Sequence, residues 1–216
     1  MTRLKAGTRP SPLALKQVEE IRALLPGLDF ETVTISTSGD KDKNTPLSEM
    51  EGTDFFTRQI EDALLSGKID FAVHSAKDMP DKLRNGLAIA AITRSADPYD
   101  ALVSKGGLKI HELRQGARVG ASSSRRKSQL KSYRSDLQIV DIRGNVGDRI
   151  DALNKKDLDA VVIAAAGLMR LGLEGMIAQK IPKDIMEPHP LQGRLAIQIK
   201  HNRKDLIEIF RRIDAD

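Results

Sequence analysis

The segment HSAKDMP at 74–80 holds residue types that could do chemistry at one point of the chain. It follows the apolar run 69–73, which predicts a buried strand, and its proline ends that strand because proline lacks the N–H that a ladder requires. Ser75, Lys77 and Asp78 are therefore expected at the carboxyl end of a strand, where open α/β sheets bind ligands. An Asp–Lys pair there could steady a cationic intermediate. Taken alone, a single such pair is better explained as a solvated turn.

Arginines beside predicted helix starts form a second set of candidates. Arg9 precedes Ser11-Pro12, which predicts a helix start because serine caps the first turn and proline needs no donor there. Arg9 could hold an anion at the positive end of this helix, or it could be an ordinary exposed arginine. The run SSSRR at 122–126 follows the predicted strand 117–121 and starts another helix. Its triple serine with Arg125–Arg126 exceeds what capping needs and indicates an anion site.

Further arginines follow two more predicted strands. The segment RGNVGDR at 143–149 comes after the strand 137–142, and its glycines let the backbone approach a ligand. Arg170 follows the apolar run 159–166, which predicts a fully buried strand. The arginines near strand ends are thus Arg125, Arg126, Arg143, Arg149 and Arg170. This recurrence is hard to explain as a solvated surface and predicts an anionic ligand.

The composition bounds the class of protein. The chain has 216 residues, of which 40% are hydrophobic and 30% charged, as in a globular protein of one large or two smaller domains. Its net charge of +5 (35 − 30) suits an anionic ligand as well as nucleic acid. The sequence has no cysteine, which excludes disulfides, Cys–zinc sites and thiol nucleophiles among these residues. The first ten residues lack a signal region and no run approaches a membrane span, so we expect a cytoplasmic protein that binds no membrane.

Hydrophobic periodicity predicts an α/β fold of two lobes joined by two crossings. The first lobe is expected to combine residues 1–94 with 194–216, and the second to span 99–187. The crossings are expected at 95–98 and 188–193, where prolines and turn residues interrupt the strands.

Three local features complete this prediction. The polar stretch 38–52 predicts a long surface loop and a candidate lid. A helix is expected from Thr53 to Leu65, with Phe55 and Phe56 more probable as core residues than as a stacking platform. The first helix is expected to bury one apolar face made of Leu15, Val18, Ile21, Leu24 and Leu25.

Several motifs are missing from the sequence. It contains no GxGxxG and no GxxxxGK[ST], so we predict no standard nucleotide loop. The four histidines show no metal-ligand spacing, and we predict no metal site. We expect ordinary surface or core roles for His74, His111, His189 and His201.

At this point the sequence resembles a known family, the porphobilinogen deaminases, also called hydroxymethylbilane synthases. The matching segments keep their order along nearly the entire chain, so the resemblance is specific. They are TRPSPLALKQ (8–17), Gly39-Asp40, Thr45-Pro46-Leu47, HSAKDMP (74–80), GASSSRR (120–126), RGNVGDR (143–149), AAGLMRLG (165–172) and Gln192-Gly193.

The resemblance implies a fold, a reaction and a set of roles. It implies two lobes like those of type II periplasmic binding proteins with a cleft between them, and head-to-tail condensation of four porphobilinogen molecules into linear hydroxymethylbilane. The aspartate at the position of Asp78 would serve the pyrrole N–H groups and the azafulvenium cation left when ammonia departs. The arginines that would hold acetate and propionate groups are Arg9, Arg125, Arg126, Arg143, Arg149 and Arg170. Additional hydrogen bonds would come from Ser11, Ser75, Lys77, Ser122, Ser123, Asn145 and Gln192.

The chain departs from the family pattern at a few positions. It stops where the family's third domain is expected to begin, and that domain carries the cysteine that bears the dipyrromethane cofactor. These 216 residues hold no cysteine to form that thioether. Where the family has two lysines in the lid loop, this sequence has Glu49 and Thr53, and Ala121 replaces the threonine expected before the serine pair. Leu191 and Arg194 replace the small residues usual around Gln192.

Three functional hypotheses follow. The first is a porphobilinogen deaminase that acts as a monomer, with a separately encoded third domain or with a pyrrole primer held noncovalently. The second is a protein that binds porphobilinogen or a tetrapyrrole without turnover: the missing cysteine favours it, whereas Asp78 favours the enzyme. The third is a nucleic-acid-binding or regulatory module, suggested by the net charge of +5. The absence of Trp and of a helix-turn-helix argues against it.

Overall fold

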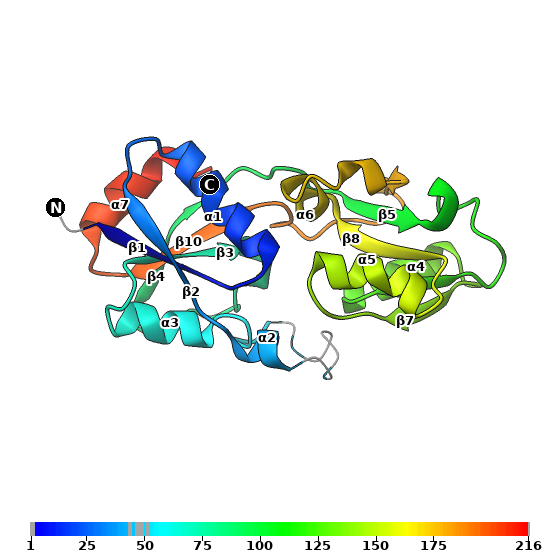
Figure 1. The fold of residues 1–216 in the computed structure, drawn as a ribbon, viewed down its shortest axis with the longest axis horizontal. Coiled ribbons are helices and arrows are strands. Elements are labelled where there is room, and N and C mark those ends of the chain that lie inside the picture. The colour runs from blue at the N-terminus through cyan, green and yellow to red at the C-terminus, as the bar shows by residue number, and fades with distance from the viewer. Residues whose placement is uncertain (1–2, 43–44, 46–49, 51, 216) are drawn as a thin grey trace. The chain divides into compact units, whose positions relative to one another are not determined.

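The computed structural model describes residues 3–42, 45, 50 and 52–215. The chain forms two compact units, each built around its own five-stranded sheet (Figure 1). The first unit comprises Met1–Asp42, Gly52–Ala96 and Arg194–Asp216, and the second comprises Lys43–Glu51 and Asp97–Gly193. No helix in the described part of the chain is long and apolar enough to cross a membrane.

The sheet of the first unit has the order β2-β1-β3-β10-β4. Its strands are β1 (Leu4–Thr8), β2 (Phe30–Thr34), β3 (Phe71–Ser75), β4 (Leu87–Ile92) and β10 (Leu195–Lys200). β1 runs parallel to β2 and β3, whereas β10 runs antiparallel to both of its neighbours, β3 and β4. The helical segments are α1 (Pro12–Leu24), α2 (Ser38–Lys41), α3 (Arg58–Leu65), α7 (Lys204–Phe210) and the 3₁₀ turns η2 (Ala76–Asp78) and η5 (Arg211–Ile213). The predicted strand before Asp78 is confirmed.

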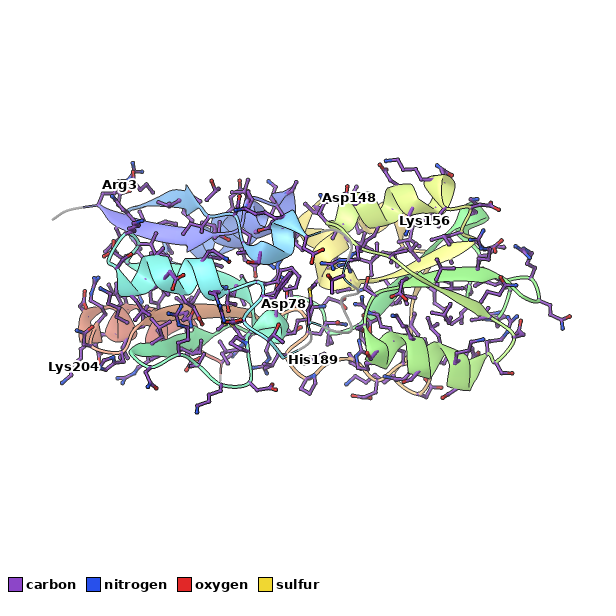
Figure 2. The ribbon with its side chains drawn as sticks, turned by 90° about the horizontal axis from the view of Figure 1, so that it is seen from below. Arg3, Asp78, Asp148, Lys156, His189 and Lys204 are labelled. Carbon is purple, nitrogen blue, oxygen red and sulfur yellow. The ribbon has the colours of Figure 1, made fainter. Side chains whose placement is uncertain are left out.

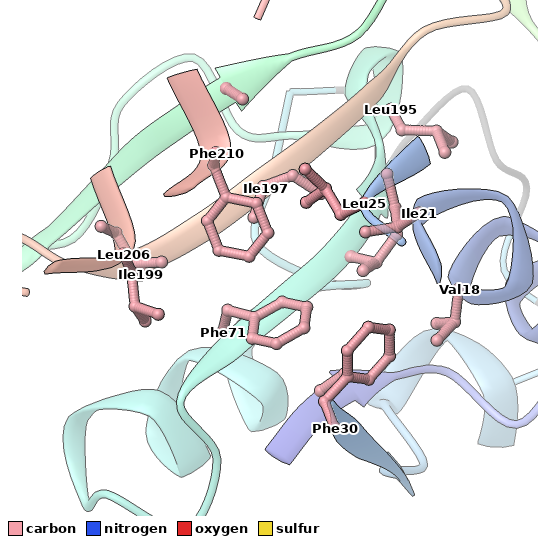
Figure 3. Packing of buried hydrophobic residues seen from close by; sticks show 13 residues of the cluster. Val18, Ile21, Leu25, Phe30, Phe71, Leu195, Ile197, Ile199, Leu206 and Phe210 are labelled. Atoms are coloured by element: carbon pink, nitrogen blue, oxygen red, sulfur yellow. The ribbon is translucent and has the colours of Figure 1, made fainter. Parts of the chain in front are cut away.

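Three phenylalanines from distant parts of the sequence meet in the core of the first unit (Figure 3). Phe71 of β3 lies edge-on to Phe30, with 5.1 Å between the ring centroids, and its centroid is 4.9 Å from that of Phe210. Helices α1 and α7 cover this face of the sheet, and α3 covers the other face with Ile60 and Leu64 (Figure 1). β3 is therefore packed on both faces, which fixes the position of the turn that follows it.

The second unit has the same plan, with the strand order β7-β6-β8-β5-β9. Its strands are β5 (Asp100–Ser104), β6 (Arg118–Ala121), β7 (Gln138–Asp141), β8 (Ala160–Ala164) and β9 (Gln179–Lys180). β6 is parallel to β7 and β8, and β5 is antiparallel to β8 and β9. The helical segments are α4 (Ser124–Tyr133), α5 (Val146–Lys155), α6 (Ala165–Arg170) and the 3₁₀ turns η3 (Lys105–Gly107) and η4 (Glu174–Met176). Each unit thus joins three parallel strands to an antiparallel fourth strand.

Some predicted details of the helices are wrong. The buried stripe of α1 runs through Ala14, Val18 and Ile21 to Leu25 at its end. Leu15 and Leu24 are 37% and 46% exposed, because each is one position from a residue of this stripe and so points about 100° away from it. Gln17 is also buried on this face. The apolar run 159–166 was predicted as one strand, but its last two residues begin α6.

The segment before α3 also differs from the prediction. α3 begins at Arg58 rather than at Thr53, because the backbone N–H groups of Thr57 and Arg58 both bond to the carbonyl of Asp54 and close a turn first. Phe55 and Phe56 lie in this turn and are half-buried rather than part of the core. Of the predicted lid loop, residues 38–41 form α2, whereas Glu49 lies outside the described residues.

Candidate functional site

Asp78 lies on a short turn fixed directly to the end of β3 (Figure 2). The N–H of Ala76 donates to the carbonyl of Arg194 at 3.0 Å, and the N–H of Met79 donates to the carbonyl of Ala76 at 3.3 Å. The side chain of Asp78 is exposed and Lys77 is half-buried. The predicted position at the carboxyl end of a strand is confirmed, and the turn presents a carboxyl group on a fixed backbone.

Ser75, the last residue of β3, is tied to α1. Its hydroxyl accepts a hydrogen bond from the side-chain amide of Gln17 at 2.9 Å. Gln17 is 4% exposed, so this bond is formed at a largely buried position. Sequence reasoning placed Ser75 among the hydrogen-bonding candidates and missed its partner, because Gln17 precedes it by 58 residues.

Three buried polar side chains, linked in series by hydrogen bonds, begin at His74 in β3, just before the Asp78 turn. His74 Nε2 lies 3.1 Å from Gln198 Oε1, and Gln198 Nε2 donates to Glu61 Oε1 at 2.9 Å. Glu61 and Gln198 are fully buried and His74 is 6% exposed. Since Gln198 uses its amide N–H on Glu61, its oxygen is left to accept from His74, which assigns the histidine proton to Nε2. We refer to Glu61, Gln198 and His74 as the buried polar chain.

The pKa of His74 is strongly lowered. Burial lowers this pKa from 6.5 to about 4, outweighing the hydrogen bond with Gln198 and the charge of Asp78, which favour the protonated form. Arg9 lowers the same pKa further. His74 is therefore neutral at physiological pH, and of the two ordinary roles expected for it, surface or core, the structure shows the core.

Arg9 and Ser11 both have structural partners in the first unit. Arg9 Nε donates to Asp40 at 3.0 Å, and its guanidinium lies 4.5 Å from the ring centroid of Phe56. Burial would raise the pKa of Asp40, but hydrogen bonds from Arg9 and Thr37 lower it below its usual value. Ser11 caps α1 by accepting from the N–H of Ala14 at 3.2 Å, as its position before a proline predicts.

Arg125 and Arg126 converge on one carboxylate in the second unit. Arg125 Nη2 donates to Asp100 Oδ2 at 2.6 Å, and Arg126 Nε donates to Asp100 Oδ1 at 2.9 Å. Gln192 adds a third bond from Nε2 to Asp100 Oδ1 at 3.0 Å. Asp100 is fully buried, which would raise its pKa, but the charges of Arg126 and Arg125 lower that pKa to about 2. Sequence reasoning placed a crossing at 95–98 and missed Asp100, two residues beyond it.

The serines before these arginines act mainly on the backbone. Ser122 Oγ donates to the carbonyl of Ile142 at 2.8 Å and so links the ends of β6 and β7. Ser123 is the N-cap of α4 and accepts from the N–H of Arg126 at 3.3 Å. Both serines thus hold the start of α4, which carries the arginine pair.

The remaining predicted residues lie near the same edge of the second sheet, because β6, β7 and β8 are parallel and their carboxyl ends coincide. Arg143 and Asn145 follow β7, and Arg149 lies in the first turn of α5 with Nε on the carbonyl of Gly144 at 3.0 Å. Arg170 ends α6 and donates to the carbonyl of Gly193 at 2.8 Å. This edge therefore gathers the basic side chains that the sequence predicted after these strands.

Comparison with known proteins identifies the chain. The family model described as "Porphobilinogen deaminase, dipyromethane cofactor binding domain" matches residues 4–208. The porphobilinogen deaminase of Natranaerobius thermophilus is 46% identical, in a match that covers 95% of this chain and 68% of the relative. This chain belongs to the porphobilinogen deaminase family. The porphobilinogen deaminase of Rubrobacter xylanophilus is also 46% identical, over 98% of this chain and 70% of the relative.

Solved structures support the fold that porphobilinogen deaminase membership implies. The methionine-binding protein MetQ superposes with a TM-score of 0.57 at 15% identity and covers 97% of this chain and 87% of its own. The substrate-binding protein AbpA of Streptococcus pneumoniae superposes with a TM-score of 0.50 at 16% identity, covering 98% of this chain and 86% of its own. At such identities the likeness concerns the fold alone, and it confirms the predicted type II binding-protein lobes.

The residues of this porphobilinogen deaminase fit the cofactor in part. Guanidinium groups at one edge of the second sheet provide the donors that carboxylate side chains of a pyrrole require. None of the 216 residues is a cysteine, so none can form a thioether to it. Among the described residues, no cluster of three or more His, Asp or Glu side chains could hold a metal ion.

We expect Asn145→Ala to lower the free energy of unfolding of this porphobilinogen deaminase by about 1 kcal/mol. Asn145 Oδ1 accepts from the N–H of Asp148 at 3.0 Å, and Asp148 accepts from the N–H of Asn145 at 2.9 Å, which forms a reciprocal cap on α5. Urea unfolding measures the change. Asn154→Ala, near the other end of the same helix, is the matched control and should not destabilise the protein. Equal effects of the two substitutions would contradict the capping role.

Proposed function

We propose that this chain acts as a porphobilinogen deaminase, or hydroxymethylbilane synthase, in tetrapyrrole biosynthesis. This transferase releases ammonia from porphobilinogen and condenses four molecules into linear hydroxymethylbilane. Family membership supports the reaction, and the observation that carries it to particular atoms is the exposed Asp78 carboxylate on a turn fixed to β3. We further propose that the protein is monomeric and cytoplasmic and that its substrate is a small molecule rather than a nucleic acid.

Asp78 is the proposed catalytic residue. When the aminomethyl C–N bond of porphobilinogen breaks, the bonding electrons leave with nitrogen as ammonia and a cation remains on the pyrrole. The free α-carbon of a second pyrrole attacks this cation and a C–C bond forms. The attacking ring then loses the proton of that α-carbon and regains its aromaticity. A fixed carboxylate beside the cation and the pyrrole N–H groups lowers the energy of the charged state. Because Asp78 needs no rearrangement of its backbone, this stabilisation is preorganised.

The arginines are proposed to bind the acetate and propionate groups of the pyrroles. A carboxylate accepts two parallel N–H bonds from one guanidinium, which fixes both its position and its orientation. The proposed binding residues are Arg9, Arg125, Arg126, Arg143, Arg149 and Arg170, with further hydrogen bonds from Ser11, Ser75, Lys77, Ser122, Ser123, Asn145 and Gln192. Ser11, Ser123 and Asn145 also accept hydrogen bonds as helix caps, so they stabilise these helix starts in addition to the proposed binding.

The pyrrole primer is proposed to be held by these basic residues. Bound dipyrromethane supplies a pyrrole carbon to which substrate units are added. Because none of these 216 residues offers a thiol, we propose that they hold the primer noncovalently. A domain that bears the family's cysteine would replace this arrangement by a covalent one.

Incubation of the purified chain with porphobilinogen tests the proposal. We expect loss of porphobilinogen and, after oxidation, appearance of porphyrin, with intact mass recorded in parallel to detect covalent additions. Saturable porphobilinogen binding without consumption would instead indicate a binding protein. Absence of both binding and consumption would contradict the proposed function.

A further inference from the structure

Among the described residues of the second unit, Asp100 is the only fully buried carboxylate that contacts two arginines. It is the first residue of β5, and its two oxygens face Arg125, Arg126 and Gln192. Gln192 also donates to the carbonyl of Pro98 at 2.8 Å. Residues near both ends of the segment Asp97–Gly193 therefore meet the start of α4 at a single carboxylate.

The charges at this cluster do not cancel. Two guanidinium groups and one carboxylate leave one net positive charge, so the arginine pair can still attract an anion. The side chain of Arg126 is 5% exposed, whereas that of Arg125 is 26% exposed. Arg125 also contacts the carbonyl of Glu187, so its guanidinium is held from two sides while part of it faces solvent. Such a group keeps a single orientation without losing its charge.

We propose that Asp100 is a positioning residue, which holds Arg125 and Arg126 in the orientation that binds a carboxylate side chain of the pyrrole substrate. The inference rests on the proposed function, because that function supplies the carboxylate ligand. A long arginine side chain loses considerable conformational entropy when it binds a ligand. Asp100 fixes the two guanidinium groups before the ligand binds, so less side-chain entropy is lost on binding.

A charge-only role for Asp100 predicts the opposite result from a positioning role. If Asp100 merely reduced the positive charge, its neutralisation would strengthen binding of an anionic ligand. If Asp100 positions the arginines, neutralisation weakens binding although the charge of the cluster rises. In Asp100→Asn, the new amide N–H group faces N–H donors, so at least one arginine loses its acceptor. The sign of the change therefore separates the two roles.

The matched control is Asp159→Asn in the same unit. Asp159 also accepts a forked pair of bonds, from Arg114 Nε at 3.0 Å and Nη2 at 2.9 Å, and a bond from the N–H of Arg118 at 2.7 Å. Neither arginine belongs to the proposed binding set. The control thus removes the same charge from a similar ion pair that has no proposed contact with substrate.

Isothermal titration with porphobilinogen at constant ionic strength measures the effect on the full chain. We expect Asp100→Asn to raise the Kd by roughly tenfold or more, and Asp159→Asn to leave it within about twofold. Asp100→Glu keeps the charge but displaces it by one methylene, and we expect a Kd two- to fivefold above that of the unchanged chain. An unchanged or lower Kd in Asp100→Asn would overturn the proposal. If that variant fails to fold, an unchanged Kd in Asp100→Glu would overturn it equally.

A ligand-free measurement separates this inference from the proposed function. Guanidinium NMR of the unchanged chain should show slow rotation of the Arg125 and Arg126 groups, and Asp100→Asn, or Asp100→Glu if only that variant folds, should accelerate it. Rapid rotation of both groups in the unchanged chain would overturn positioning whether or not porphobilinogen binds. Slow rotation together with absent porphobilinogen binding would support positioning and refute the proposed substrate.

Discussion

Asp78→Asn is expected to lower the turnover of porphobilinogen by about 10²- to 10³-fold while leaving the stability and the substrate affinity of the chain nearly unchanged. The asparagine keeps the size of the side chain and removes the negative charge that is proposed to stabilise the cation. Asp78 is exposed, so the substitution breaks no buried contact, and surface substitutions of this kind change stability by about 0.5 kcal/mol or less. The loss should therefore fall on kcat rather than on KM.

Asp81→Asn is the matched control for this prediction. Asp81 is also exposed and lies three residues further along the same segment, so it tests whether a loss of charge nearby is sufficient. Single-turnover measurement of ammonia release, with thermal unfolding of each variant, distinguishes chemistry from folding. A kcat of Asp78→Asn within threefold of the unchanged chain would refute the catalytic role. So would an equal loss of kcat in the two variants.

The sequence was sufficient to predict the backbone that carries the site. Apolar runs near 71–75 and 160–164 predict strands because side chains buried on both faces leave a local signature, and Ser11-Pro12 predicts a helix start for equally local reasons. Asp78 and the arginines could be placed at strand ends from these patterns alone. The spacing of turns and strands also led to the two α/β units.

The partners of the site residues could not be predicted in this way. Asp100 precedes Gln192 by 92 residues, and Glu61 precedes Gln198 by 137. A glutamate within a helix normally indicates a solvated position, because a charged side chain is buried only when a partner from elsewhere in the chain satisfies it. Periodicity contains no information about such a partner. The burial of Glu61 therefore follows from the tertiary fold and not from the helix that contains it.

The structure changes how the predicted arginines are understood. Arg9, Arg126 and Arg170 each contact a protein acceptor, namely Asp40, Asp100 and the carbonyl of Gly193. A guanidinium has five N–H donors, and Arg126 makes three hydrogen bonds with them, two to Asp100 and one to the carbonyl of Val162. These contacts restrict the rotation of each group before substrate arrives. The basic residues are therefore better described as a prearranged set than as mobile surface charges.

The acid sensitivity of the first unit should depend on one histidine. The folded pKa of His74 is about 4, compared with 6.5 for an unburied histidine, so above pH 6.5 the ring is neutral in both states. Between pH 6.5 and 4 the unfolded chain takes up a proton that the folded chain excludes, and stability falls as the pH falls. This pKa difference lowers the free energy of unfolding by about 3 kcal/mol once the pH is below 4, and by roughly 2 to 3 kcal/mol at pH 4.5.

We expect His74→Gln to remove this component of the acid sensitivity. Glutamine can still donate from Nε2 to the oxygen of Gln198, so the buried polar chain keeps its hydrogen bond, but glutamine does not titrate. Native-state hydrogen exchange of β3 and β10 amides at pH 7 and pH 4.5 reports on the first unit alone. Carboxylates titrate equally in both proteins, so their contribution cancels in the comparison.

His111→Gln, at an exposed position, is the control and should retain the full pH dependence. If His74→Gln lost as much stability on acidification as the unchanged chain, the proton taken up on unfolding would belong to another group, and burial of His74 would not be what makes this unit sensitive to acid.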